Sequence, residues 1–168
     1  MILNVKQLFE CTGYEESFKY HIDADEYLAE CVEGIRFPVA IEGVAKNCAD
    51  VVTIEAQISY SMNVQCDRCL RPFELNQNLT VFHTLVRALS NEDTVSDEFI
   101  VVDSDSFDMD DLFAGEIVLA LPTKLLCNED CKGLCPVCGH DLNEGDCGCD
   151  RRERDPRLAA LYDLLNND

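Results

Sequence analysis

The stretch from Cys127 to Cys149 holds six of the chain's eleven cysteines within 23 residues. Thiolates bind Zn²⁺ in tetrahedral sets of four, and short spacings such as C-x2-C bring two of them together. Six is not a multiple of four, so two ligands must come from elsewhere in the chain, or two of the six are idle. The other closely spaced pair, Cys66 and Cys69, raises the number to eight, which is enough for two complete sites.

The eight cysteines can be divided into two sites in two ways. The first division makes a compact site from Cys135, Cys138, Cys147 and Cys149, and a second from Cys66, Cys69, Cys127 and Cys131. The alternative joins the two C-x2-C pairs, as in zinc ribbons, and leaves Cys127, Cys131, Cys147 and Cys149 together. We favour the first division because its last four cysteines are close enough in sequence to fold locally, with Gly148 permitting the bend that a C-x-C pair requires.

The metal and its role follow from the ligand set. Four thiolates leave no open coordination position, so we expect about two structural Zn²⁺ ions and no catalytic one. Iron–sulfur clusters are also held by sets of four cysteines, and the spacing alone does not exclude them. A metal buffer or redox protein is a further possibility, which closed four-thiolate sites disfavour.

Composition indicates where such a chain works. With 168 residues, 47% of them apolar, the chain suits one domain or one domain with a small appendage. No run approaches the roughly 20 apolar residues of a membrane span, and the N-terminus lacks the pattern of a signal peptide. We therefore predict a cytoplasmic protein, in which closely spaced cysteines are metal ligands rather than disulfides. We expect the isolated Cys11, Cys31 and Cys48 to serve as small apolar core or surface residues and claim no chemistry for them.

The formal net charge of −20 limits the choice of partners. Binding to nucleic acid depends on Lys and Arg that neutralise phosphates, so a broad RNA-binding or DNA-binding face is not expected. An acidic surface favours basic partners, among which ribosomal proteins are abundant, although many cytosolic proteins are simply acidic.

The clearest secondary-structure signal is a long β-hairpin. Apolar and polar residues alternate strictly from Val52 to Gln65, which indicates a strand with one buried face and one exposed face. A second alternating run follows from Phe73 to Leu85. The pair Cys66 and Cys69 lies between the two runs, at the expected hairpin tip.

Weaker signals suggest the remaining elements. We expect a strand over 18–22, a helical run over 24–30, a strand over 35–48 with a bend or bulge at Gly43, and a strand over 98–102. Ser106 or Asp108 can cap a helix over about 109–121, apolar on nearly all sides and therefore deeply packed. A short helix that begins near Asp155 and Pro156 should end the chain.

These elements predict an α+β fold. We expect a mainly antiparallel sheet or partial barrel with a long hairpin and one buried helix in a domain of residues 1–126. Residues 127–168 would form a cysteine-rich zinc module followed by the short helix.

No catalytic constellation emerges, and we predict that the chain is not an enzyme. His21, His83 and His140 stand apart in the sequence, and no glycine-rich phosphate loop is present. If RNA is touched, the hairpin tip near Arg68 and Arg71 is the candidate, because residues 66–90 are slightly net positive.

Taken together, these motifs resemble the YceD family, the large ribosomal RNA subunit accumulation proteins. The resemblance rests on QCDRCLRPFE after a long strand, on EIVLALP, on the cysteine stretch and on DPRLAALYDLL, and it covers roughly residues 50–168. It implies a bacterial cytosolic factor of ribosome biogenesis, needed for accumulation of large-subunit RNA, with no established enzymatic activity. It also implies that Cys66 and Cys69 belong to the common core and that Cys135 to Cys149 form an added module.

Two functions remain to be compared. The first is a non-catalytic assembly or stability factor for the large ribosomal subunit that acts through ribosomal or ribosome-assembly proteins. The alternative is an RNA-processing enzyme or accessory that contacts RNA through the hairpin tip.

Overall fold

The computed structural model describes residues 1–49, 51–87 and 99–150, which belong to two compact units. Unit 1 comprises Met1–Val64 and Pro72–Thr123. Unit 2 comprises Gln65–Arg71 and Lys124–Asp168, so the tip of the hairpin belongs to it together with the cysteine-rich segment. The expected C-terminal helix lies outside the described residues.

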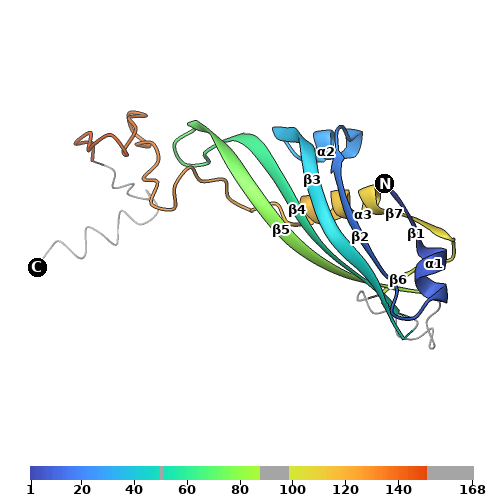
Figure 1. Ribbon diagram of the computed structural model, residues 1–168. Helices are drawn as coiled ribbons and strands as arrows, with labels where there is room; N and C mark the ends of the chain where they lie inside the picture. The colour runs from blue at the N-terminus through green and yellow to red at the C-terminus, as the bar shows by residue number, and fades with distance from the viewer. Residues whose placement is uncertain (50, 88–98, 151–168) are drawn as a thin grey trace, which may run out of the picture. The chain divides into compact units, whose positions relative to one another are not determined.

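Unit 1 is built on an open, mixed five-stranded sheet in the order β2-β3-β4-β5-β6 (Figure 1). Its strands are β2 (Glu15–Ile22), β3 (Ile35–Cys48), β4 (Val51–Gln65), β5 (Pro72–Val86) and β6 (Phe99–Val101). β3 pairs antiparallel with both β2 and β4, whereas β6 runs parallel to β5. The predicted α+β fold with a long hairpin is confirmed, and the sheet does not close into a barrel.

The long hairpin follows the alternation of its sequence. Every second residue of β4 is buried: Val52, Ile54, Ala56, Ile58, Tyr60, Met62 and Val64. The residues between them face the other side of the sheet and are mostly exposed. Because a strand's side chains alternate between its two faces, this pattern gives β4 one face toward the core.

The irregularity in β3 is not at Gly43, where the bend or bulge was expected. The register against β4 shifts between Arg36 and Ala40, a stretch that contains Pro38. Proline has no N–H to donate to the ladder, which accounts for a break there. Gly43 stays paired with Ala56. A Cβ at Gly43 would collide with the Glu55 carbonyl oxygen of β4 and lie 2.7 Å from the Phe18 ring, so glycine is needed there because both the neighbouring strand and that ring approach closely.

Helix α3 (Met109–Leu119) lies beside the sheet, with Met109, Phe113, Ala114 and Ile117 buried (Figure 1). Asp108 caps it by accepting a hydrogen bond from the Asp110 N–H at 3.0 Å. The Phe113 ring packs 6.3 Å from that of Phe18 on β2. The helix is shorter than expected and less deeply packed, since Leu119 is 82% exposed.

The N-terminal elements complete unit 1. Helix α2 (Glu26–Cys31) is capped by Asp25, whose side chain accepts from the Leu28 N–H, and it coincides closely with the expected helical run. Strand β1 (Ile2–Asn4), helix α1 (Val5–Glu10) and strand β7 (Ser106–Asp108) were not predicted. β1 pairs with β7, about a hundred residues away in the sequence, and no local sequence pattern predicts this pairing. None of the helices within the described ranges has the length and apolar character needed to cross a membrane.

Candidate metal centres

The first cysteine group joins the hairpin tip to the segment that follows α3. Cys66 and Cys69 come from the tip and Cys127 and Cys131 from the later segment, and their four sulfurs lie within 4.8 Å of one another. The Cys66 and Cys131 sulfurs are 3.8 Å apart and those of Cys69 and Cys127 are 3.6 Å apart. A tetrahedron with metal–sulfur bonds of about 2.3 Å separates its sulfurs by about 3.8 Å, so the group fits a Zn²⁺ ion.

The second group is contained within a short segment. It comprises Cys135, Cys138, Cys147 and Cys149, whose sulfurs also lie within 4.8 Å of one another. Gly148 has a φ of 71°, which provides the bend expected between the last two cysteines. The structure thus groups the eight cysteines according to the first division, which the close spacing of the last four cysteines favoured, and not according to the ribbon-like alternative.

The two C-x2-C pairs form the same turn. The N–H of the residue after the second cysteine donates to the carbonyl of the first, at 2.9 Å for Leu70 and 2.8 Å for Gly139. Both residues are left-handed, with φ values of 58° and 73°. Glycine adopts this conformation freely, whereas a residue with a Cβ loses roughly 1–2 kcal/mol, so Leu70 is held there against its preference.

In each group, backbone N–H groups aimed at one sulfur make its thiol a stronger acid. Burial raises the pKa of Cys66, but the backbone N–H groups of Cys127, Cys69 and Arg68 together lower it to about 6. At Cys135 the N–H groups of Cys138 and Val137 outweigh burial and also lower the pKa to about 6.

A second thiol in each group resists ionisation. Burial, and then the neighbouring sulfurs, raise the pKa of Cys127 to about 12. The sulfurs of Cys138 and Cys147, and then burial, raise that of Cys149 to about 12. Each group therefore holds one negative charge readily and further charges only at a cost, because anionic sulfurs repel one another. A divalent cation among the four sulfurs removes that repulsion.

Polar contacts within unit 2 hold the first group in place. The N–H of Asp67 donates to the Leu125 carbonyl at 2.8 Å, and the Asp67 carboxylate accepts from the Leu125 N–H at 2.7 Å. The Arg68 guanidinium donates to the Cys131 carbonyl at 2.7 Å. Arg71 pairs with Asp141 at 3.0 Å and with Glu144 at 3.7 Å.

Sequence reasoning missed two residues near the sulfurs, Asp141 and Asn143. The Asn143 amide donates to the Cys131 sulfur at 3.4 Å, and Asp141 accepts from Asn143 and from Arg71. An Asp or Asn in a polar loop carries no spacing signal, so nothing in the sequence marks these two.

The three histidines lie outside the two cysteine groups. His21 and His140 are exposed. His83 lies 3.3 Å from Glu116 in unit 1. The isolated Cys11, Cys31 and Cys48 are exposed on unit 1.

Comparison with known proteins adds an independent finding. The model of the family described as "Large ribosomal RNA subunit accumulation protein YceD" matches residues 54–165. YlbN, an uncharacterized protein of Bacillus subtilis (strain 168), is 32% identical over 140 residues, which cover 78% of this chain and 76% of YlbN.

Relatives from mycobacteria match a shorter part. Uncharacterized proteins of Mycobacterium bovis (strain ATCC BAA-935 / AF2122/97) and Mycobacterium tuberculosis (strain ATCC 25618 / H37Rv) are each 32% identical over 103 residues. The match covers 60% of this chain and 49% of each relative, about half of their length. No solved structure matches.

Proposed function

The chain belongs to the YceD family, and we propose that it is a non-catalytic factor of ribosome biogenesis that supports accumulation of large-subunit ribosomal RNA. The family's description and the match over residues 54–165 carry this proposal. We further propose that it acts in the bacterial cytoplasm through ribosomal or ribosome-assembly proteins.

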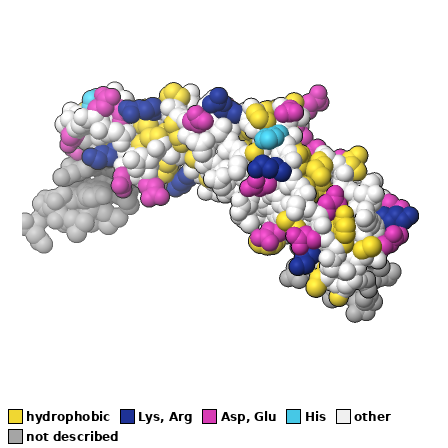
Figure 2. Space-filling model, in the orientation of Figure 1, with side chains coloured by type: hydrophobic (Ala, Val, Ile, Leu, Met, Phe, Trp, Pro, Cys, Tyr) yellow, Lys and Arg dark blue, Asp and Glu magenta, His cyan; other side chains and the backbone are white. Residues whose placement is uncertain are grey.

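The charge of the chain supports protein partners over a broad RNA contact. The formal net charge is −20, and acidic side chains are spread over the face that Figure 2 shows. Such a surface attracts basic proteins and repels the phosphate backbone.

The contacts of Arg68 and Arg71 also favour protein partners. These two residues were the candidates for touching RNA at the hairpin tip. Arg68 donates to the backbone carbonyls of Cys131 and Glu129, and Arg71 pairs with two carboxylates. Their guanidinium groups are therefore engaged within unit 2, which leaves less of them for phosphate.

We propose that both cysteine groups bind structural Zn²⁺. The ligands would be Cys66, Cys69, Cys127 and Cys131 in one site and Cys135, Cys138, Cys147 and Cys149 in the other. The sulfur–sulfur distances of 3.8 and 3.6 Å in the first group support this assignment. Bound Zn²⁺ would replace the hydrophobic core that a segment this short lacks, and would order residues 127–150 as the zinc module of a two-part chain whose other part is the β-rich domain.

Elemental analysis tests the metal sites. The purified chain should contain about two Zn²⁺ per molecule, and paired Cys→Ser substitutions in either group should lower the content to about one. One metal in the unaltered chain would contradict the two sites. Iron in place of zinc, together with visible absorption, would show that the cysteines hold iron–sulfur clusters instead.

Capture of partners tests the function. The tagged chain should recover ribosomal or ribosome-assembly proteins from a bacterial lysate, before and after ribonuclease treatment. Cells that lack the protein should accumulate less large-subunit than small-subunit RNA. Failure of both results would defeat the proposal.

Filter binding with large-subunit RNA distinguishes a factor that acts through proteins from one that contacts RNA directly. Direct phosphate contact predicts binding that weakens steeply as salt rises, and it predicts that Arg68→Ala and Arg71→Ala reduce binding. A factor that acts through proteins should show neither effect. Steep salt dependence together with sensitivity at these two arginines would favour the alternative.

A further inference from the structure

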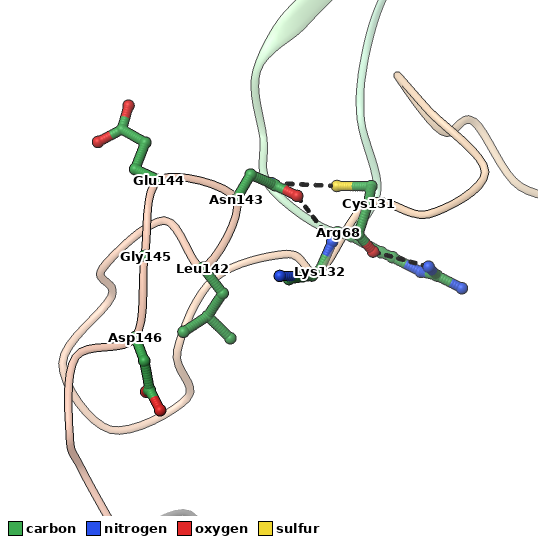
Figure 3. A pocket seen from close by; sticks show the side chains of 8 residues that line it. All are labelled: Arg68, Cys131, Lys132, Leu142, Asn143, Glu144, Gly145 and Asp146. Atoms are coloured by element: carbon green, nitrogen blue, oxygen red, sulfur yellow. Dashed lines mark hydrogen bonds between the residues drawn. The ribbon is translucent and has the colours of Figure 1, made fainter.

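The loop enclosed by the second cysteine group also contacts a sulfur of the first. Asn143 lies between Cys138 and Cys147 in the sequence, so a metal bound by the second group closes the loop that carries it. Its side-chain amide points at the Cys131 sulfur and donates to it at 3.4 Å (Figure 3). We propose that Asn143 couples the two metal sites, so that metal bound at either one strengthens binding at the other. This inference rests on the proposed metal sites.

The Asn143 amide is fixed by other contacts besides the sulfur. Its oxygen accepts from the Lys132 N–H at 2.8 Å, and its NH₂ group also donates to the Asp141 carboxylate at 2.7 Å. The same carboxylate oxygen accepts the Asn143 backbone N–H at 2.9 Å. Once the loop is ordered, these contacts orient the amide on both sides and direct its N–H at the sulfur.

The rest of the loop is bound to the segment that joins the two groups. The Leu142 N–H donates to the Gly133 carbonyl at 2.9 Å, and Leu134 forms a β-bridge with Asp141. The Cys135 N–H donates to the His140 carbonyl at 2.8 Å. Ordering this loop therefore also orders the residues that follow Cys131.

Coupling follows from two physical effects. An N–H donor withdraws charge from a thiolate and orients it, and removing such a partner of a metal ligand weakens metal binding by about tenfold to a hundredfold. In addition, the first metal to bind bears the entropic cost of ordering the loop, and the second does not. Thermodynamic linkage requires that metal at the first group raise the affinity of the second by the same factor as metal at the second raises the affinity of the first.

Asn143 is a suitable position for substitution. It is exposed, and with Arg68 and Lys132 it borders an open hollow of about 760 Å³ (Figure 3). Asn143→Asp preserves the size and the acceptor for Lys132 but removes the N–H donor. Asn76→Asp makes the same chemical change at an exposed position of β5 and is the matched control.

The experiment measures Zn²⁺ and Co²⁺ affinity of the full-length chain by competition with a chelator. The Cys138→Ser/Cys149→Ser variant leaves the first group intact, and the Cys66→Ser/Cys69→Ser variant leaves the second. Asn143→Asp is made alone and in each of these backgrounds. Circular dichroism checks that the sheet of unit 1 is retained in every variant.

We expect Asn143→Asp to weaken metal binding at the first group by about tenfold to a hundredfold, with Asn76→Asp unchanged. The sulfur-to-Co²⁺ charge-transfer band of that group should move to lower energy, which a purely structural role would not produce. Loss of the second group should weaken the first by about 5-fold to 150-fold, and loss of the first should weaken the second by the same factor. In the Cys138→Ser/Cys149→Ser background, Asn143→Asp should cause little further loss of metal affinity at the first group.

Two results would overturn the coupling. One is a chain that binds two ions whose affinities do not change when the other group is removed. The other is an effect of Asn143→Asp that is equally large with and without the second group. Binding of no metal at all would defeat the proposed metal sites as well, so the two failures are distinguishable.

Discussion

Gly133 offers a sharp test of how the hairpin tip and the cysteine-rich segment fit together within unit 2. Its φ is +74°, and a Cβ built on it would lie 2.8 Å from the Arg68 carbonyl oxygen and 3.1 Å from the Arg68 Cβ. Gly133→Ala therefore combines an unfavourable backbone conformation with a collision against the C-x2-C turn of the first group.

The magnitude follows from these two terms. A left-handed residue with a Cβ costs roughly 1–2 kcal/mol. Relieving the collision moves residue 133 away from Arg68 and stretches the bond from the Leu134 N–H to the Arg68 carbonyl, now 3.0 Å long. Such a bond contributes about 1 kcal/mol. The total of about 2–3 kcal/mol corresponds to a roughly 30-fold to 140-fold change in the folding equilibrium of unit 2.

The assay is denaturation of the Co²⁺-loaded chain, followed by its thiolate absorption, which reports on unit 2 alone. Two neighbouring glycines serve as controls. Gly139 has a φ of 73° and open space where a Cβ would lie, so Gly139→Ala should lose only the stability that the left-handed backbone costs. Gly145→Ala has neither problem and should leave stability unchanged or raise it by about 0.4–1 kcal/mol. A Gly133→Ala variant no less stable than Gly139→Ala would refute the argument that the Arg68 backbone closes this space.

Three further predictions address the two units. Phe113→Ala should reduce the stability of unit 1 by about 3–5 kcal/mol in urea titrations, because this ring is fully buried, whereas the exposed Gln57→Ala should change it by no more than about 0.5 kcal/mol. Burial raises the pKa of Tyr60, and burial followed by the Asp110 carboxylate raises that of Tyr20. The unfolded chain therefore loses these phenol protons first, and the stability of unit 1 should fall as the pH rises above about 10. With both tyrosines replaced by phenylalanine, the urea midpoint of unit 1 should fall less between pH 9 and pH 11 than it does in the unaltered chain. An equal fall in the two chains would show that these tyrosines are not the cause. Removal of metal with a chelator should accelerate amide hydrogen exchange at Leu134 and Leu142 while β4 stays protected, because only unit 2 depends on the metals. Equal acceleration in β4, or no change in unit 2, would count against that dependence.

Local patterns predicted the parts of the fold that depend on local physics. The alternation from Val52 to Val64 requires only that one face of a strand be buried, and the structure has that face buried throughout. Asp108 was one of two candidate caps, and its carboxylate caps α3 because it can reach a free backbone N–H.

Elements that depend on distant residues were not predictable in the same way. β1 exists because it pairs with β7, and each strand has only three residues, too few for a periodic signal. The sequence of α3 is apolar on nearly all sides and so predicts deep packing, whereas only one stripe of the helix is buried and Leu119 is exposed.

For the cysteine-rich stretch, the sequence by itself determined that eight cysteines could form two sets of four, since thiolate count and spacing are local properties. It left open which sulfurs share a set. The tertiary structure decided that question, because it places the Cys66 sulfur 3.8 Å from that of Cys131, 65 positions away, and the Cys69 sulfur 3.6 Å from that of Cys127, 58 positions away. Contacts of this kind depend on the path of the folded backbone, which no spacing between cysteines encodes.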